Sequence, residues 1–316
     1  MGKELVAIAL GGNMILRKGQ PKTYEQQMEN LRVAIDVIVE VISQGYGVIL
    51  THGNGPQVGN ILVQQKAGEV KNIPAQPLNI CGAMSQGQIG FMIQTALEER
   101  LCESNITDKR VVAIITRAAV DHLDSAFKEP TKPIGPFYSE EEAIELHATT
   151  RDTYINDAGR GFRKVVPSPI PLEILEGATI RRCVEAGDIV IAVGGGGIPV
   201  ARENGNFVDV EAVIDKDRAT EVLATQIDAD VLMILTDVSN AYINYNKENQ
   251  QKIEKATVSE IKKYIQEEHF SKGSMKPKME SAARFIEQGG RLSIVTSPKN
   301  ALLALKDKAG TRITKG

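Results

Sequence analysis

The sequence predicts an α/β protein whose mainly parallel sheet is covered by helices on both faces. Two observations support this fold class: short apolar runs with little polar alternation, and amphipathic stretches that separate them. Runs of this kind are typical of strands that are buried on both sides. Strands that alternate with helices favour a parallel sheet packed between two helical layers.

The predicted strands are rich in β-branched residues. They are Leu5–Leu10, Gly47–Thr51, Arg110–Thr116, Asp188–Val193, Val231–Leu235 and Leu292–Thr296. Helices are predicted over Thr23–Ser43, Pro56–Ala67, Ala83–Cys102, Ala178–Ala186, Asp217–Gln226 and Lys278–Gln288. In the first helix, Leu31, Ile35 and Ile38 recur at helical spacing, and Thr23 with Gln26 forms a predicted capping box at its start.

Two regions interrupt the alternation of strands and helices. Asp121–Val165 is rich in proline, glycine and charge, yet it contains the aromatic residues Phe127, Phe137, Tyr138, Tyr154 and Phe162. Disordered linkers are poor in aromatic residues, so this segment is predicted to be an ordered insertion with a small core. Tyr242–Thr257 surrounds the polar run NKENQQ and is predicted to be a surface hairpin.

Composition excludes several classes of protein. The 316 residues carry a formal net charge of −3, without the basic excess expected of a nucleic-acid-binding protein. No apolar run reaches the roughly 18 residues needed to span a membrane. The three cysteines form no CxxC pair, the four histidines show no metal-binding spacing, and no secretory signal pattern is present. These features predict a cytosolic protein with reduced thiols.

Glycine-rich loops follow three of the predicted strands. They are Gly11-Gly12-Asn13, Gly53-Asn54-Gly55 after His52, and Gly194–Gly197, which contains Gly195 and Gly196. In open α/β sheets, ligands bind beyond the carboxyl ends of the strands. Glycine lets backbone N–H groups approach phosphate oxygens closely, although each loop alone is equally consistent with a tight turn. Together the loops predict a phosphate site.

Two common nucleotide motifs are missing from the sequence. There is no GxxxxGK[ST] pattern, which excludes a P-loop kinase. Gly194–Gly197 continues into Ile198-Pro199-Val200, so the dinucleotide fingerprint of a dehydrogenase also fails. Phosphoryl transfer without a P-loop lysine needs other cations.

Three lysines occupy settings that suit this task. Lys216 and Lys278 lie where helices are predicted to begin, which is unfavourable for the helix dipole, and Lys132 lies in the rigid loop Pro130–Gly135. Asp217, beside Lys216, is placed to orient lysine ammonium groups. The simpler alternatives are exposed lysines and a helix-capping acid. Tyr242 follows a strand end and fits either a cover for a nucleotide base or an ordinary surface position.

Several of these segments resemble the amino acid kinase family, and in particular its members that act on carbamoyl phosphate. The matching motifs are GGN at Gly11–Asn13, THGNGPQVG at Thr51–Gly59, PTKPIG at Pro130–Gly135, GGGGIPV at Gly194–Val200, IDKD at Ile214–Asp217 and GSMKPKME at Gly273–Glu280. They run in order from Leu5 to about Thr296. Lys276 departs from the pattern, since relatives often carry a small or apolar residue there.

The resemblance implies a three-layer αβα sandwich made of one domain over 1–316, with 121–165 as a small protruding lid subdomain, and a homodimer. It implies the reversible reaction of ADP with carbamoyl phosphate to give ATP and carbamate, with Mg²⁺ on the nucleotide phosphates. The resemblance also implies roles for single residues. Lys132 would contact the carbamoyl group, Lys216 and Lys278 would bridge the transferring phosphoryl group, and Asp217 would organise the lysines. Hydrogen-bond donors would come from Gly11, Gly12, Asn13, Gly53 and Asn54, and the residues near the nucleotide would be Asp215, Tyr242 and Met275.

Other functions remain as alternatives. One is a relative that acts on a larger carboxylate or phosphate, and another is a nucleotide-binding regulatory protein without catalysis. The presence of all three lysines argues against loss of catalysis. No arginine lies in Gly11–Asn13, His52–Pro56 or Pro130–Gly135, which argues against a larger acid as substrate.

Overall fold

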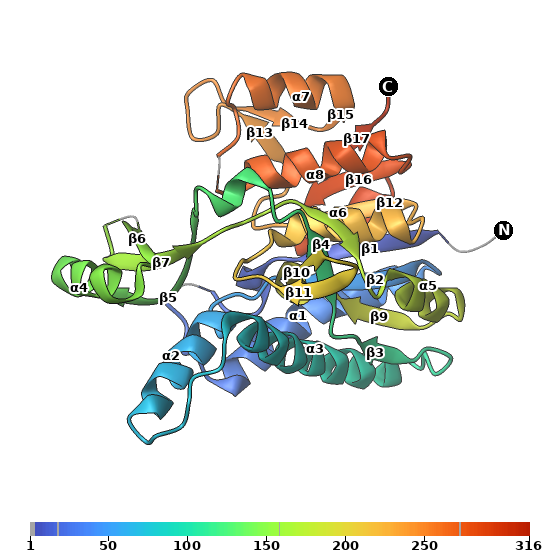
Figure 1. Cartoon of the computed structure of the whole chain (residues 1–316). Coiled ribbons are helices and arrows are strands. Elements are labelled where there is room, and N and C mark those ends of the chain that lie inside the picture. Colours follow the sequence, from blue (N-terminus) through green and yellow to red (C-terminus); the bar gives the residue numbers. More distant parts are fainter. Residues whose placement is uncertain (1–3, 18, 158, 272) are drawn as a thin grey trace.

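A central sheet of eight strands forms the body of the protein (Figure 1). The structure is a computed structural model that describes residues 4–17, 19–157, 159–271 and 273–316. In sheet order the strands are β15 (Lys255–Thr257), β17 (Thr311–Thr314), β16 (Leu292–Thr296), β12 (Val231–Leu235), β1 (Leu5–Leu10), β2 (Gly47–His52), β9 (Ile189–Ala192) and β3 (Val111–Ala113). Neighbouring strands are parallel except for the antiparallel pair β16–β17, so the predicted mainly parallel sheet is confirmed.

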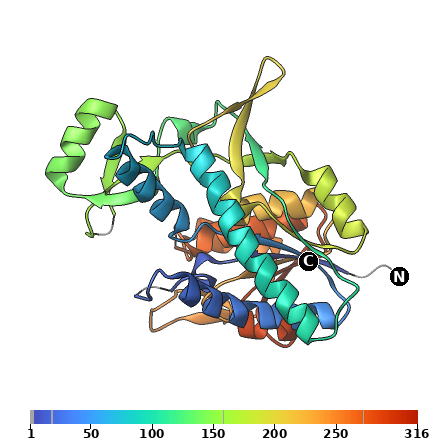
Figure 2. The same cartoon turned by 90° about the horizontal axis from the view of Figure 1, so that it is seen from below.

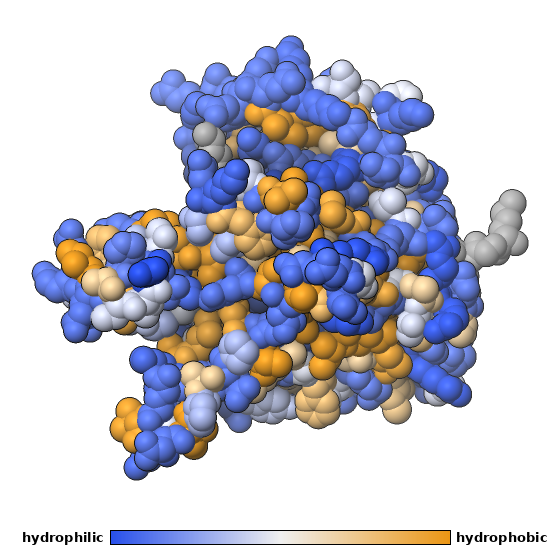
Figure 3. All heavy atoms as spheres, viewed as in Figure 1, coloured by the Kyte–Doolittle hydropathy of each residue, from blue (hydrophilic) through white to orange (hydrophobic). Residues whose placement is uncertain are grey.

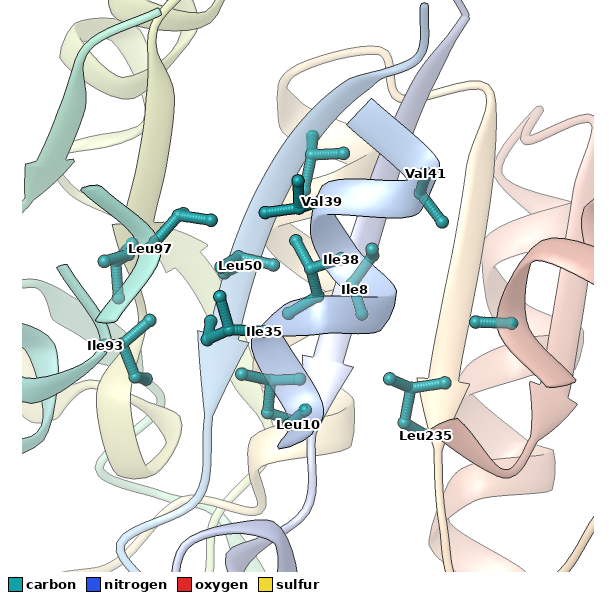
Figure 4. Close-up of a cluster of buried hydrophobic side chains, with 14 of the residues drawn as sticks. Ile8, Leu10, Ile35, Ile38, Val39, Val41, Leu50, Ile93, Leu97 and Leu235 are labelled. Atoms are coloured by element: carbon teal, nitrogen blue, oxygen red, sulfur yellow. The ribbon is translucent and has the colours of Figure 1, made fainter. Parts of the chain in front are cut away.

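The two faces of the sheet pack against different helices. Along β1, Ile8 and Leu10 belong to one buried cluster and Ala7 and Ala9 to the other, because successive side chains of a strand point to opposite faces. The first cluster includes side chains of α1 (Tyr24–Ser43), α3 (Leu78–Glu103) and α9 (Ala301–Leu305), part of which Figure 4 shows. The second includes α5 (Gly177–Glu185), α6 (Lys216–Gln226), α7 (Val258–Gln266) and α8 (Met275–Glu287). The protein is therefore a three-layer α/β sandwich.

The ends of the helices differ slightly from the predictions. Thr23 caps α1 by accepting from the N–H of Gln26 at 3.3 Å, but the Gln26 side chain donates to Glu29 instead of closing the predicted capping box. α3 begins at Leu78, five residues before the predicted start, directly after Pro77, which has extended backbone geometry. The helix after the second glycine loop is α2 (Gln57–Glu69).

A second sheet accounts for the largest error in the predicted strands. The segment predicted as one strand, Arg110–Thr116, leaves the main sheet after β3 and enters β4 (Arg117–Val120). The turn is fixed by Gln86, whose side chain pairs with both the N–H and the C=O of Thr116, at 2.8 and 3.0 Å. β4 joins β10 (Ile198–Glu203), β11 (Asn206–Asp209) and β8 (Pro171–Ile174) in a four-stranded sheet.

Residues 121–165, which we call the lid segment, project from the body (Figures 1 and 2). The projection contains α4 (Glu140–Thr150) and a three-stranded sheet of β5 (Lys132–Tyr138), β7 (Phe162–Val166) and β6 (Thr153–Asn156). Tyr138 and Tyr154 meet edge to face with ring centroids 5.7 Å apart, and Ala143 is buried nearby on α4. Two of the aromatic residues noted in the sequence thus pack within the segment, whereas Phe127 packs against the second core cluster of the body.

The predicted hairpin over Tyr242–Thr257 is only partly right. β13 (Ala241–Ile243) and β14 (Gln251–Ile253) pair antiparallel, but β15 pairs in parallel with β17 in the main sheet. The buried side chain of Ala256 holds β15 against the second core cluster. Within the described residues, no helix combines the length and apolar character required to cross a membrane.

Candidate active site

A cleft of about 520 Å³ lies between the body and the lid segment. Figure 3 shows the lid segment as a lobe beside the body. The cleft is lined by the loop that joins β2 to α2, by β5, and by the first residues of α6 and α8. The predicted site residues that line it are Lys132, Lys216, Asp217, Lys278, Asp215, Gly53, Asn54, Gly55 and Gly195.

Two of the predicted lysines share one carboxylate. Lys216 Nζ lies 2.5 Å from Asp217 Oδ1, and Lys278 Nζ lies 2.7 Å from Asp217 Oδ2. All three side chains are largely buried, and Asp217 is only 2% exposed. One carboxylate between two ammonium groups leaves a net positive charge, which can stabilise an anion in the cleft.

Burial and charge shift the pKa values of this trio. Burial lowers the pKa of Lys216, and the positive charge of Lys278 lowers it further against the opposing effect of Asp217. Burial alone would raise the pKa of Asp217, but the charges and hydrogen bonds of the two lysines outweigh it and lower the pKa to about 2. Asp217 is therefore ionised at neutral pH and holds both lysines in place.

Lys132 and Asp215 face each other across the cleft. Lys132 begins β5 of the lid segment, and its Nζ lies 3.5 Å from Asp215 Oδ2. Asp215 caps α6 by accepting from the N–H of Asp217 at 3.0 Å. The Lys132 side chain remains 41% exposed, so it stays accessible to a ligand.

Backbone N–H groups of two glycine loops make internal hydrogen bonds. The N–H of Gly53 donates to the C=O of Leu10 at 3.1 Å, because the pairing of β1 with β2 continues one residue further. The N–H of Gly196 donates to Val193 at 3.1 Å, and Gly196 packs on Ile214. The N–H groups of Gly53 and Gly196 thus already have backbone partners, and the prediction that these residues bind phosphate stays a prediction. Both glycines also permit close packing. A side chain at Gly53 would meet the stem of Lys216 at 3.2 Å.

Other predicted residues lie outside the cleft. Gly11 and Gly12 form the turn after β1, where a Cβ on Gly12 would lie 2.9 Å from Gly55 Cα. Asn13 Nδ2 donates to Asp237 Oδ2 at 2.6 Å. Tyr242 lines a separate hollow with Tyr245, and Met275 packs against the second core cluster. Lys276 Nζ lies 3.9 Å from Glu280 Oε1. Their predicted roles stay predictions.

Sequence reasoning missed three basic residues that line the cleft: Lys22, Arg160 and Arg163. Both arginines reach Asp157 Oδ2, at 2.9 and 3.1 Å, and each guanidinium carbon lies 5.1 Å from the centre of the Phe137 ring. The three loops considered in the sequence contain no arginine, but the fold of the lid segment brings Arg163 of β7 and Arg160 just before it to the cleft.

Comparisons with known proteins find relatives along nearly the whole chain. The model of the amino acid kinase family matches residues 4–297. Carbamate kinase of Pyrococcus horikoshii is 52% identical to this chain over 98% of it and 99% of the relative. Carbamate kinase 2 of Enterococcus faecalis is 49% identical, covering 98% of each chain.

A solved structure extends the similarity to the whole fold. Carbamate kinase from Giardia lamblia bound to AMP-PNP superposes with a TM-score of 0.94 at 45% identity, covering 99% of both chains. The chain is accordingly an ATP-dependent phosphotransferase. It belongs to the amino acid kinase family and, within that family, to the carbamate kinases.

Proposed function

We propose that this chain transfers a phosphoryl group from carbamoyl phosphate to ADP, and back from ATP to carbamate. The observation that carries the proposal is the trio of Lys216, Asp217 and Lys278 at the floor of a cleft that Lys132 enters from the lid segment. Phosphoryl transfer depends mainly on positioning and on neutralising charge, and this arrangement provides both.

In the proposed reaction, a terminal oxygen of ADP attacks phosphorus, the bond from phosphorus to the carbamoyl oxygen breaks, and carbamate leaves with the electron pair. Lys216 and Lys278 stabilise the charge on the transferring group, because their ammonium groups are fixed by Asp217 before substrate arrives. Lys132 binds the carbamoyl end from the opposite side. Closure of the lid segment excludes water from the small acyl phosphate.

Magnesium is expected on the nucleotide phosphates. Among the described residues, no group of three acidic, histidine or cysteine side chains is placed to hold a metal by itself. Mg²⁺ in such sites takes one or two carboxylates together with phosphate oxygens, and Asp215, which lines the cleft, would contribute one. Asp217 is already committed to two lysines. When bound, the ion would neutralise phosphate charge.

Nucleotide contacts are proposed for Asp215, Tyr242 and Met275. Asp215 and Met275 lie at the starts of α6 and α8, next to the two central lysines, and Tyr242 lies on the hairpin after β12. The proposed location is the cytoplasm, which the free thiols of Cys81, Cys102 and Cys183 support.

A homodimer through α3 is also proposed. Ile80, Met84 and Phe91 are 40, 41 and 64% exposed on this helix, and the exposed Gly87 between them permits close approach. Spacings of four and seven residues place these side chains on one helical face, and contiguous exposed apolar residues of this kind mark protein interfaces. Phe91→Glu should give a monomer by sedimentation velocity, whereas a Phe91→Glu dimer would exclude this face.

One coupled assay tests the reaction. Protein, MgADP and carbamoyl phosphate should yield ATP rapidly, while acetylglutamate, aspartate and UMP with ATP should yield negligible product. The second candidate, a kinase for a larger acid, is favoured only by Arg160 and Arg163 in the cleft. Faster turnover of acetylglutamate than of carbamoyl phosphate would decide for that candidate.

A further inference from the structure

Ser85 is a fully buried side chain in the first third of α3, in contact with Asn54 of the second glycine loop. Its Oγ lies 2.6 Å from Asn54 Oδ1 and 3.1 Å from the C=O of Gly82. A serine hydroxyl has a single proton to donate, and the shorter, side-chain contact takes it. The Asn54 amide therefore accepts a hydrogen bond at its oxygen.

Gly195 confines the same amide from another side. A Cβ on Gly195 would lie 2.1 to 2.3 Å from Oδ1, Nδ2 and Cγ of Asn54, so the amide rests directly against the Gly195 backbone. Gly195 also has φ of +65°, a conformation that other residues rarely adopt. Ser85 and Gly195 thus hold the amide of Asn54, which lines the cleft.

The orientation of this amide matters because its two ends have opposite effects on an anion. An amino group donates a hydrogen bond to a phosphate oxygen, whereas a carbonyl oxygen repels it. With Oδ1 occupied by Ser85, Nδ2 is the end left for a ligand in the cleft. A rotated amide would turn its amino group toward Ser85, whose hydroxyl would then accept and direct its own proton to the C=O of Gly82, and it would present the amide oxygen to the substrate.

We propose that Ser85 is a positioning residue, which fixes the Asn54 amide so that Nδ2 donates to the transferring phosphoryl group. This inference rests on the proposed function and deepens it. The neighbouring residue supports the same view of α3, since Gln86 pairs with the backbone of Thr116, and the Thr116 hydroxyl accepts from the N–H of Val193 before the third glycine loop. Consecutive side chains of one helix thus brace two loops beside the cleft.

The test is a double-mutant cycle measured with carbamoyl phosphate and MgADP. Ser85→Ala should lower kcat about tenfold and leave the KM for ADP within about twofold, and Ser85→Thr, which retains the hydroxyl, should recover most of kcat. In an Asn54→Ala background, Ser85→Ala should have no further effect, because the group it positions is gone. Ser293→Ala is the matched control, since Ser293 is equally buried and its Oγ donates at 2.7 Å to Ala282, away from the cleft.

Two results would overturn the proposal. One is a loss of kcat in Ser85→Ala that is equally large in the wild-type and in the Asn54→Ala background, which would indicate that Ser85 has a general packing role. The other comes from Asn54→Asp, which keeps an acceptor for Ser85 but removes the amino donor: wild-type kcat in this variant would show that the amino group is not used. Absence of ATP formation by the wild-type protein would instead contradict the proposed function itself.

Discussion

Lys278 Nζ lies 2.7 Å from Asp217 Oδ2, although the two residues are 61 positions apart in the sequence. This ion pair joins the start of α8 to the start of α6, where Asp217 also binds Lys216. Replacing either lysine by alanine removes a positive charge that stabilises the transferring phosphoryl group. We expect Lys216→Ala and Lys278→Ala each to lower kcat by at least ~10²-fold.

Steady-state kinetics on folded variants check this expectation. Lys276→Ala is a suitable comparison, because Lys276 lies in the same turn of α8 and its Nζ contacts Glu280. Near-wild-type kcat in Lys216→Ala or Lys278→Ala would remove that lysine from the proposed mechanism.

Asp217 should set the alkaline limit of activity. Its carboxylate raises the pKa of Lys216 against the lowering effect of burial and of Lys278. Asp217→Asn removes that contribution, so the pKa of Lys216 falls further and the charged form is lost at lower pH. The alkaline limb of the kcat/KM profile should therefore move to lower pH than in the wild type. A profile that keeps its shape and only drops in height would contradict this reasoning.

Lys132→Met should separate the two substrates. Lys132 enters the cleft from β5, between Pro130 and Pro133, whose fixed φ limits the freedom of the loop. The variant loses a contact on the acyl side only, so use of carbamoyl phosphate should weaken while ADP affinity stays within a few-fold. Isothermal titration with ADP and initial rates with carbamoyl phosphate measure the two effects. If the variant lost only its affinity for ADP, Lys132 would instead bind the nucleotide.

The lid segment is expected to move as a unit. Its tyrosine pair packs within its own strands, and its face toward the cleft combines the basic side chains of Lys132, Arg160 and Arg163 with the apolar run from Pro133 to Phe137. Hydrogen exchange over residues 121–165 should slow when MgADP and a carbamoyl phosphate analogue are both bound. Equal exchange rates with and without saturating ligands would show that the segment is a fixed wall of the cleft.

Glu221 should make the fold less stable above neutral pH. Burial raises the pKa of Glu221 to about 7, and the charge of Arg284 and the Thr225 hydroxyl only partly oppose it. The folded state then binds the proton more tightly than the unfolded chain, so stability falls as pH rises from about 4.5 to about 7 and stays lower above. Glu221→Gln should raise the free energy of unfolding at pH 8 by on the order of 3 kcal/mol and leave it unchanged near pH 4.

Urea unfolding at both pH values measures this effect. Glu248→Gln, at an exposed position of the loop after β13, serves as the control and should behave as the wild type does at each pH. Equal stability of Glu221→Gln and wild type at pH 8 would show that the buried carboxylate carries no penalty.

The central sheet could be predicted because its strands are continuous apolar runs buried on both faces, as in Val231–Leu235. Lys216 and Lys278 could be found because cations are unusual where helices begin. The four-stranded sheet could not, since β4 and β8 have four residues each and no periodicity long enough to recognise. Arg160 and Arg163 reach the cleft, and Ser85 reaches Asn54 at its edge, only through tertiary folding, and nothing next to them in the sequence marks them.

The chain enters and leaves the lid segment through neighbouring strands. β4 leads into it and β8 follows it, and these two strands pair antiparallel, with Val120 opposite Pro171. The residues between these two strands thus form an inserted segment whose two ends lie side by side. Evolution can replace such an insertion by another of different length or charge without disturbing the lysines on α6 and α8. A single phosphotransfer scaffold can in this way acquire new acceptor molecules by exchanging one interchangeable part.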